Sequence, residues 1–279
     1  MIEKAYAKIN LCLDVIRRRE DGYHDLRMVM VPVNFYDLLT VEKSDKTSLT
    51  LNRSCIPVNE KNTVIKAIRL MQERYGITSE YACTLKKQIP TQAGLAGGSA
   101  DAAAVIRVID RMEGLHLSRE ELIDLGKQVG ADVPFCIFNE PCLVEGIGDI
   151  LTPISWNPDF MFLLVKPRAG VSTSAAFKAL DFNDIVHPDC LKMVEALRTN
   201  DYEGIVGSLG NSLEKVSLEM VREIREIKDD LEYYGFDGVL MSGSGSTVFG
   251  ITKSERLARE AGQIMRNKGY FTRTARPLR

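Results

Sequence analysis

The sequence has few of the residues that build metal centres and disulfide frameworks. It contains three histidines in 279 residues, and its six cysteines form no C-x-x-C pair: Cys12, Cys55, Cys83, Cys136, Cys142 and Cys190. Several of them stand in apolar runs such as Pro134–Phe138. This pattern is typical of reduced, buried cysteine in a cytosolic protein. We therefore predict neither a disulfide framework nor a structural metal centre.

The sequence also lacks an excess of charge and any long apolar run. Its 36 basic and 38 acidic residues give a formal net charge of −2, so nothing favours a nucleic acid or an anionic membrane as partner. The first residues, MIEKAYAKINLCLDV, have no apolar segment like that of a signal peptide. No apolar run is long enough to span a membrane. From these features we expect a cytoplasmic protein.

A chain of this length predicts one large or two ordinary domains. Residues 153–158, which include Pro153 and Pro158, look like a joint, so we predict domains over 1–153 and 154–279. The second part shows strand, helix, strand, strand, helix and strand patterns in that order. That order favours a split β-α-β sandwich and an α+β fold.

The most informative stretch surrounds a glycine loop. The alternating run Tyr81–Ile89 predicts a strand, and the apolar run Ala102–Ile106 predicts a helix, with Ser99 as its N-cap and Asp101 in its first turn. Between them stand three glycines that allow close approach of a ligand to the backbone: Gly94, Gly97 and Gly98. A strand, a glycine loop and a helix N-terminus predict a phosphate site.

Two common phosphate loops do not fit this stretch. A Walker A loop needs Lys and then Ser or Thr after its last glycine, whereas Gly98 is followed by Ser99 and Ala100. The spacing of the glycines also fails the G-x-G-x-x-G fingerprint of dinucleotide-binding folds. The alternative to a phosphate site is a tight strand-to-helix turn that uses small residues for packing.

Two charged residues stand in apolar surroundings. Lys8 and Asn10 share the polar face of a predicted strand over residues 2–19, where Lys8 could also be a solvated guard of an edge strand. Asp132 directly precedes the apolar run Val133–Phe135, where it is either a helix cap or a positioned carboxylate. The residues alone leave both alternatives open.

The order of three motifs resembles the GHMP superfamily of small-molecule kinases, which includes galactokinase and the homoserine and mevalonate kinases. The motifs are Ala7–Leu11, Pro90–Ala103 and Met241–Phe249, and the resemblance extends over nearly the whole chain. It implies a two-domain α+β fold, with an N-terminal domain like the second domain of ribosomal protein S5 and a ferredoxin-like C-terminal domain. Asp21–His24 and Gly130–Phe135 are most similar to one branch of the superfamily. That branch uses ATP to phosphorylate the 2-hydroxyl of cytidine-diphospho methylerythritol in non-mevalonate isoprenoid synthesis.

The resemblance implies a catalytic pair and an ATP site. Asp132 would accept the proton of the attacking hydroxyl, and Lys8 would orient that hydroxyl and offset developing charge. ATP, with Mg²⁺, would bind through its phosphates to eleven consecutive residues: Pro90, Thr91, Gln92, Ala93, Gly94, Leu95, Ala96, Gly97, Gly98, Ser99 and Ala100. Ser99 is a candidate ligand of Mg²⁺ by analogy only, and no metal ligand is assigned.

The resemblance also implies a site for the cytidine substrate. Tyr23 and Phe177 would sandwich the cytosine ring while His24 reads its polar edge. Asn10 and Thr173 match further substrate contacts. A second glycine loop completes the set: Ser242, Gly243, Ser244 and Gly245.

The phosphate loop departs from the family pattern, in which glycine or serine would stand at Gln92, Ala93, Ala96 and Ala100. We expect alanine only at positions of negative φ, and so expect a somewhat reshaped phosphate cradle. Two other functions stay open: a GHMP kinase of a different substrate, and a protein of this fold that only senses a ligand. For the assembly we expect a monomer or a weak homodimer.

Overall fold

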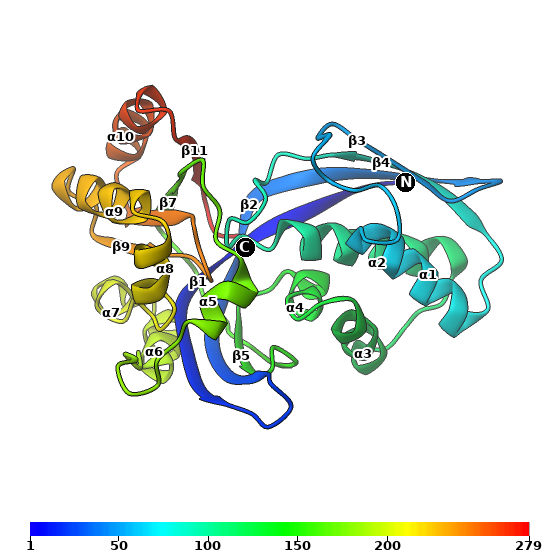
Figure 1. Cartoon of the computed structure of the whole chain (residues 1–279), viewed down its shortest axis with the longest axis horizontal. Helices are drawn as coiled ribbons and strands as arrows, with labels where there is room; N and C mark the ends of the chain where they lie inside the picture. The colour runs from blue at the N-terminus through cyan, green and yellow to red at the C-terminus, as the bar shows by residue number, and fades with distance from the viewer. Residues whose placement is uncertain (279) are drawn as a thin grey trace. The chain divides into compact units, whose positions relative to one another are not determined.

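The structure is a computed structural model that describes residues 1–278. It divides into two compact units, each assembled from separate parts of the chain (Figure 1). The first unit holds residues 1–7, 36–90 and 96–139. The second holds residues 8–35, 91–95 and 140 to the end of the described chain. The boundary after residue 153 stays a prediction, because these units are defined by contacts and not by family motifs.

Four helices and a sheet make up the first unit. The helices are α1 (Thr63–Tyr75), α2 (Gly97–Glu113), α3 (Arg119–Val129) and α4 (Val133–Phe138). Its strands are β3 (Ser48–Leu51), β4 (Glu80–Lys86) and parts of β1 (Ile2–Arg18) and β2 (His24–Ser44), in the order β3-β4-β2-β1. β2 runs antiparallel to β4, and β3 runs parallel to it. Helix α2 packs against α1 and α4 through an almost wholly apolar face, which forms the core of this unit.

Strand β2 runs without a break over 21 residues. It includes two polar residues, Asn34 and Asp37. In the structure each has a partner: Asn34 Oδ1 accepts the Arg276 N–H at 2.7 Å, and Asp37 pairs with Lys87. Because both polar side chains are satisfied by residues far along the chain, the strand continues through them.

The helix after the glycine loop begins earlier than predicted. Ser99 is not its N-cap but its third residue, because α2 starts at Gly97 and Ala96 holds the capping position. A Cβ at Gly97 would lie 2.9 Å from Ile89 Cγ2, so only glycine lets the helix begin there. Helix α3 begins with a capping box, in which the Ser118 and Glu121 side chains each accept from the other's backbone N–H.

The second unit contains a four-stranded antiparallel sheet in the order β11-β7-β10-β9. Its strands are β7 (Met161–Lys166), β9 (Gly238–Met241), β10 (Val248–Thr252) and β11 (Phe271–Ala275). Helices α9 (Glu223–Tyr233) and α10 (Glu255–Asn267) pack against it. The predicted split β-α-β sandwich is therefore confirmed. A further helix, α8 (Glu214–Met220), is separate from α9 because the backbone is extended at Val221.

The rest of this unit surrounds the long strands β1 and β2. Strand β1 pairs in parallel with β8 (Gly210–Asn211), and β2 pairs with β5 (Cys142–Gly146), which pairs with β6 (Ile150–Pro153). Three helices complete it: α5 (Thr173–Lys178), α6 (Cys190–Thr199) and α7 (Tyr202–Gly207).

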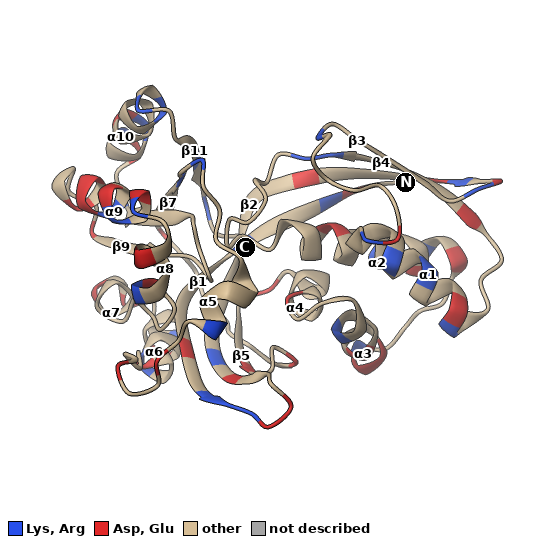
Figure 2. Cartoon of the chain, in the orientation of Figure 1, with Lys and Arg blue, Asp and Glu red and all other residues tan. Residues whose placement is uncertain are grey.

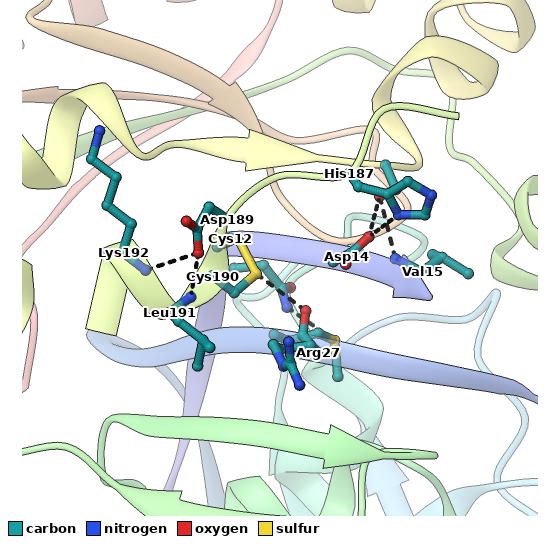
Figure 3. The surroundings of a disulfide bond; sticks show 12 residues. Cys12, Asp14, Val15, Arg27, His187, Asp189, Cys190, Leu191 and Lys192 are labelled. Atoms are coloured by element: carbon teal, nitrogen blue, oxygen red, sulfur yellow. Dashed lines mark hydrogen bonds and ion pairs between the residues drawn. A yellow bond between two sulfur atoms is a disulfide. The ribbon is translucent and has the colours of Figure 1, made fainter. Parts of the chain in front are cut away.

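A disulfide joins Cys12 of β1 to Cys190, the first residue of α6 (Figure 3). The expectation that all cysteines are reduced is wrong for this pair. The two residues are 178 positions apart, with Cα atoms 5.5 Å from each other, so no sequence spacing could reveal the bond. Asp189 caps α6 through the N–H groups of Leu191 and Lys192, which fixes the helix end that carries Cys190.

Basic and acidic residues are interspersed along the outer faces of the helices in both units (Figure 2). None of the helices in residues 1–278 combines the length and the apolar character that a membrane crossing requires.

Candidate active site

Lys8 is a buried ammonium on β1, not a solvated edge residue. Its side chain is 4% exposed, and Nζ donates to Asn10 Oδ1 at 2.5 Å. Its backbone N–H donates to the Leu95 carbonyl at 3.3 Å. Because strand residues two apart share a face, Lys8 and Asn10 stand together as predicted, and the first half of the phosphate loop is tied to their strand.

The two glycine loops pack directly on each other within the second unit. Ser242 Oγ donates to the Gly94 carbonyl at 3.0 Å and accepts the Asn10 N–H at 3.3 Å. The Thr247 N–H donates to the Ala93 carbonyl at 3.2 Å. A Cβ at Gly94 would lie 1.9 Å from the Ser242 carbonyl oxygen, so this close approach requires glycine. The two glycine loops, which are separate in the sequence, thus form one joined structure beside Lys8.

The second glycine loop is held from several sides. Asn211 Nδ2 donates to the carbonyls of Met241 and Gly243, at 2.8 Å each. Ser217 Oγ donates to the Ser244 carbonyl at 3.0 Å. The Thr173 and Ser244 hydroxyls lie 2.9 Å apart, which joins the start of α5 to this loop. Sequence reasoning missed Asn211 and Ser217, since neither stands in a motif.

The other half of the phosphate loop lies in the first unit and ends in α2. The first N–H groups of an α-helix have no partner within the helix, and they carry the positive end of its dipole. Thr63 Oγ1 holds this turn by donating to the Gly98 carbonyl at 2.8 Å. The expectation that alanine occupies only negative φ is wrong for Ala96, whose φ is +55°; Gln92 is also left-handed at +49°. The loop therefore keeps left-handed turns at these two non-glycine positions.

Asp132 directly precedes α4 and is half-buried. Its side chain makes no capping hydrogen bond to that helix. The end of α4 is fixed by Arg107, whose Nη1 donates to the Cys136 carbonyl at 2.6 Å. The helix-cap interpretation of the carboxylate therefore lacks support, and its role as a catalytic base stays a prediction.

An aromatic set stands at the start of β2, in α5 and on the segment that follows α5. The ring centroids of His24 and Phe177 are 4.9 Å apart with an interplanar angle of 30°. Phe182, which sequence reasoning missed, stacks near His24 at 6.0 Å and 8°. Tyr23 is 59% exposed, and its ring meets no other aromatic ring in residues 1–278. The structure thus brings together His24 and Phe177 of the three predicted base contacts.

The surroundings of His24 favour its uncharged form. Burial, with a smaller contribution from the nearby Arg18 charge, holds the pKa of His24 below its usual value. A neutral imidazole offers one N–H donor and one nitrogen acceptor. The ring can therefore both stack and form a directional hydrogen bond with a flat, polar ligand.

Comparisons with known proteins agree on one family. The GHMP kinases N terminal domain matches residues 62–140, and the GHMP kinases C terminal domain matches residues 193–270. A 4-diphosphocytidyl-2-C-methyl-D-erythritol kinase of Clostridium botulinum (strain Eklund 17B / Type B) is 40% identical, over 97% of this chain and 99% of that protein. One of Bacillus subtilis (strain 168) is also 40% identical, over 91% and 89%.

Solved structures show the same likeness. A crystal structure of 4-(cytidine 5′-diphospho)-2C-methyl-D-erythritol kinase superposes with a TM-score of 0.82 at 31% identity, covering 99% of both chains. A homoserine kinase of Cytophaga hutchinsonii has a TM-score of 0.75 at 19% identity, over 99% of this chain and 97% of that one, which shows a shared fold alone. With both family domains matched and near-complete coverage of its relatives, this chain belongs to the GHMP kinase family and is a small-molecule kinase.

Proposed function

We propose that this kinase transfers the γ-phosphoryl group of ATP to the 2-hydroxyl of 4-diphosphocytidyl-2-C-methyl-D-erythritol, a step of non-mevalonate isoprenoid precursor biosynthesis. The observation that carries the choice of substrate is the 40% identity, over nearly the full length of both chains, to kinases of that name. The His24, Phe177 and Phe182 rings support it, because they offer a stacking surface of the kind that a pyrimidine base needs.

The chemistry requires one base, one cation and a cradle for phosphate. The bond between the γ-phosphorus and the β-γ bridging oxygen breaks, and a bond forms from that phosphorus to the substrate oxygen. The hydroxyl proton passes to the Asp132 carboxylate. The buried Lys8 ammonium, oriented by Asn10, would hold the attacking oxygen and offset its developing charge. Because phosphoryl transfer depends mainly on positioning and electrostatics, these groups suffice.

The glycine loops would supply the phosphate cradle. The N–H groups at the start of α2 suit an anion. Residues 90–96 form the loop in front of that helix, and residues 97–100 form its first turn. Ser242 and Thr247 of the second loop brace Gly94 and Ala93 of the first. Both loops would thus act on ATP, the first by direct contact and the second by holding the first in place.

The site would select cytosine by stacking on aromatic rings and by one hydrogen bond to the polar edge of the base. Phe177 lies against His24, and cytosine would take a place beside these rings, with Tyr23 closing from the exposed side. The neutral His24 can donate to or accept from the polar edge of cytosine. Thr173, held by Ser244, is placed at the start of α5 for a further substrate contact.

Mg²⁺ would enter with the nucleotide. No group of three or more His, Cys, Asp or Glu side chains suited to a metal ion occurs in residues 1–278. This fits Mg²⁺, which proteins commonly hold through one or two ligands while substrate phosphates and water supply the rest. Ser99, in the first turn of α2, is the candidate protein ligand. When bound, the ion would neutralise charge on the phosphates.

The variant Asp132→Asn tests the proposed chemistry. We expect ADP release to fall by at least about 10²-fold, since general-base catalysis contributes that much, while ADP binding measured by calorimetry stays within about twofold. Asp124→Asn is the matched control, because Asp124 is an exposed aspartate paired with Arg74 in the same unit; it should retain full activity. Loss of ADP binding in Asp132→Asn would show a structural carboxylate instead. Full turnover in that variant would contradict the assignment.

A further inference from the structure

A buried cluster of three charges lies beneath the start of α2, outside the proposed catalytic groups. Lys87 Nζ donates to a carboxylate oxygen of Asp37 and, at 2.6 Å, to Asp101 Oδ2. The side chains are 4%, 0% and 5% exposed, in the order Lys87, Asp37 and Asp101. All three belong to the first unit. Two carboxylates thus share one ammonium away from water.

The cluster joins the two ends of the phosphate loop. Lys87 follows β4 directly, three residues before Pro90, whereas Asp101 lies on α2 just past the loop. Asp37 extends the tie, since its Oδ1 accepts the backbone N–H groups of Gln88 and, at 2.8 Å, Ile89. The Lys87 ammonium therefore fixes the distance between the residues that precede the loop and helix α2, which follows it.

The cluster also touches the helix start itself. A Cβ at Gly97 would lie 3.3 Å from Lys87 Nζ, so the ammonium sits against the first residue of α2. The Lys87 backbone is held on both sides by Asn52, whose Oδ1 accepts the Lys87 N–H at 2.8 Å and whose Nδ2 donates to the Lys87 carbonyl at 3.2 Å. Lys87 is therefore held in place by Asn52, and its ammonium in turn positions the N–H of Gly97.

Stability alone does not account for such a cluster. Replacing a buried ion pair by apolar residues is often neutral or stabilising, because desolvation offsets the attraction. Here Asp101 Oδ1 is also buried with no hydrogen-bond partner among residues 1–278. These are features of a group kept for geometry at an energetic cost.

We propose that Asp37, Lys87 and Asp101 form a positioning cluster that holds the glycine loop and the first turn of α2 at the spacing that the phosphates of ATP require. None of the three touches the reacting atoms; they act through the backbone N–H groups of the loop and helix. The inference rests on ATP as the phosphoryl donor. It assigns to Asp101 a role in nucleotide affinity that its sequence position, two residues past Ser99, does not suggest.

Calorimetric binding of ADP and of adenosine to the whole protein tests the cluster. Asp101→Ala breaks the tie from Lys87 to α2. We expect its Kd for ADP to rise by roughly tenfold or more, the scale seen when a group that orients a binding group is removed, while its Kd for adenosine stays unchanged. Asp101→Asn keeps an oxygen that can accept from Lys87 and so preserves the tie to α2, and it should bind ADP within about threefold of wild type.

A control separates positioning from general loosening of this unit. Tyr81→Phe removes another buried polar contact of β4, the 2.8 Å bond from the Tyr81 hydroxyl to Glu113, and should leave both Kd values unchanged. Unchanged ADP binding in Asp101→Ala would overturn the proposal, as would equal weakening of ADP and adenosine in both Asp101 variants. If the wild-type protein itself binds no ADP, the proposed ATP-dependent function fails instead.

Discussion

His24 combines three properties that recognition of a base requires: a flat ring, a polar edge and a neutral form that its lowered pKa favours. Its ring lies against Phe177 and near Phe182, and burial lowers its pKa. Protonation would turn the accepting nitrogen into a donor and place a charge among apolar rings. Under the proposed function, the same side chain would link substrate affinity to pH.

We expect the KM for the cytidine substrate to rise as the pH falls through the pKa of His24, which lies below 6.5. The sign follows from the lowered pKa: above it the ring is neutral and able to accept, and below it the ring is charged. Steady-state kinetics between pH 5 and 8 measure this. In His24→Asn, which cannot titrate, the KM should be higher at every pH and its rise on acidification should disappear. If the KM rises equally on acidification in the wild type and in His24→Asn, the effect belongs to another group.

Single residues differ in how well the sequence revealed them. Lys8 and Asn10 could be singled out because alternation places both on one strand face, and the structure confirms that Lys8 is buried beside Asn10. Asp101 looked like a first-turn acid, yet it lies buried on an ammonium 14 residues away. No feature of the sequence pointed to Phe182 as a residue of the site. Contacts between residues that are distant in the chain depend on the fold, and they cannot be deduced from one sequence.

At the scale of elements, periodicity predicted the type of most helices and strands, and tertiary contacts decided their limits. β2 continues through Asn34 and Asp37 because each finds a partner elsewhere. α2 begins at Gly97, before the serine that resembles a cap, because the missing Cβ permits contact with Ile89. The disulfide between β1 and α6 is likewise a product of packing, since 178 residues separate its cysteines.

The Cys12–Cys190 disulfide predicts a specific thiol count and a loss of stability on its removal. Protein denatured without reductant should expose four reactive thiols, those of Cys55, Cys83, Cys136 and Cys142. In Cys12→Ser/Cys190→Ser the free energy of unfolding in urea should fall by about 2–4 kcal/mol, since the bond closes a long loop of the unfolded chain.

Cys55→Ser provides the control for the disulfide, because Cys55 is exposed and free. It should leave the unfolding curve of the oxidised protein unchanged and lower the thiol count by one. Six reactive thiols in denatured wild-type protein that has met no reductant would contradict the bond.

For the whole molecule, motif order was more informative than composition. Three motifs in sequence implied the GHMP fold and the kinase activity, and the two family domains match over the second and the third of these motifs. The ferredoxin-like strand order β11-β7-β10-β9 agrees with the predicted succession of elements. The sequence did not reveal that Ala93 and Gly94 are braced by Ser242 and Thr247, because loop-on-loop contact depends on the folded backbone.

The most direct test of the whole account is product formation from ATP and Mg²⁺ with 4-diphosphocytidyl-2-C-methyl-D-erythritol, run beside mevalonate, homoserine and galactose. Phosphorus NMR of the product together with ADP release identifies both the acceptor and the hydroxyl that is phosphorylated. The account predicts turnover with the cytidine compound alone and one new phosphomonoester on its 2-hydroxyl. Turnover with another acceptor would discard the assignment of His24 and Phe177 to a base, and no turnover with any acceptor would contradict the kinase itself.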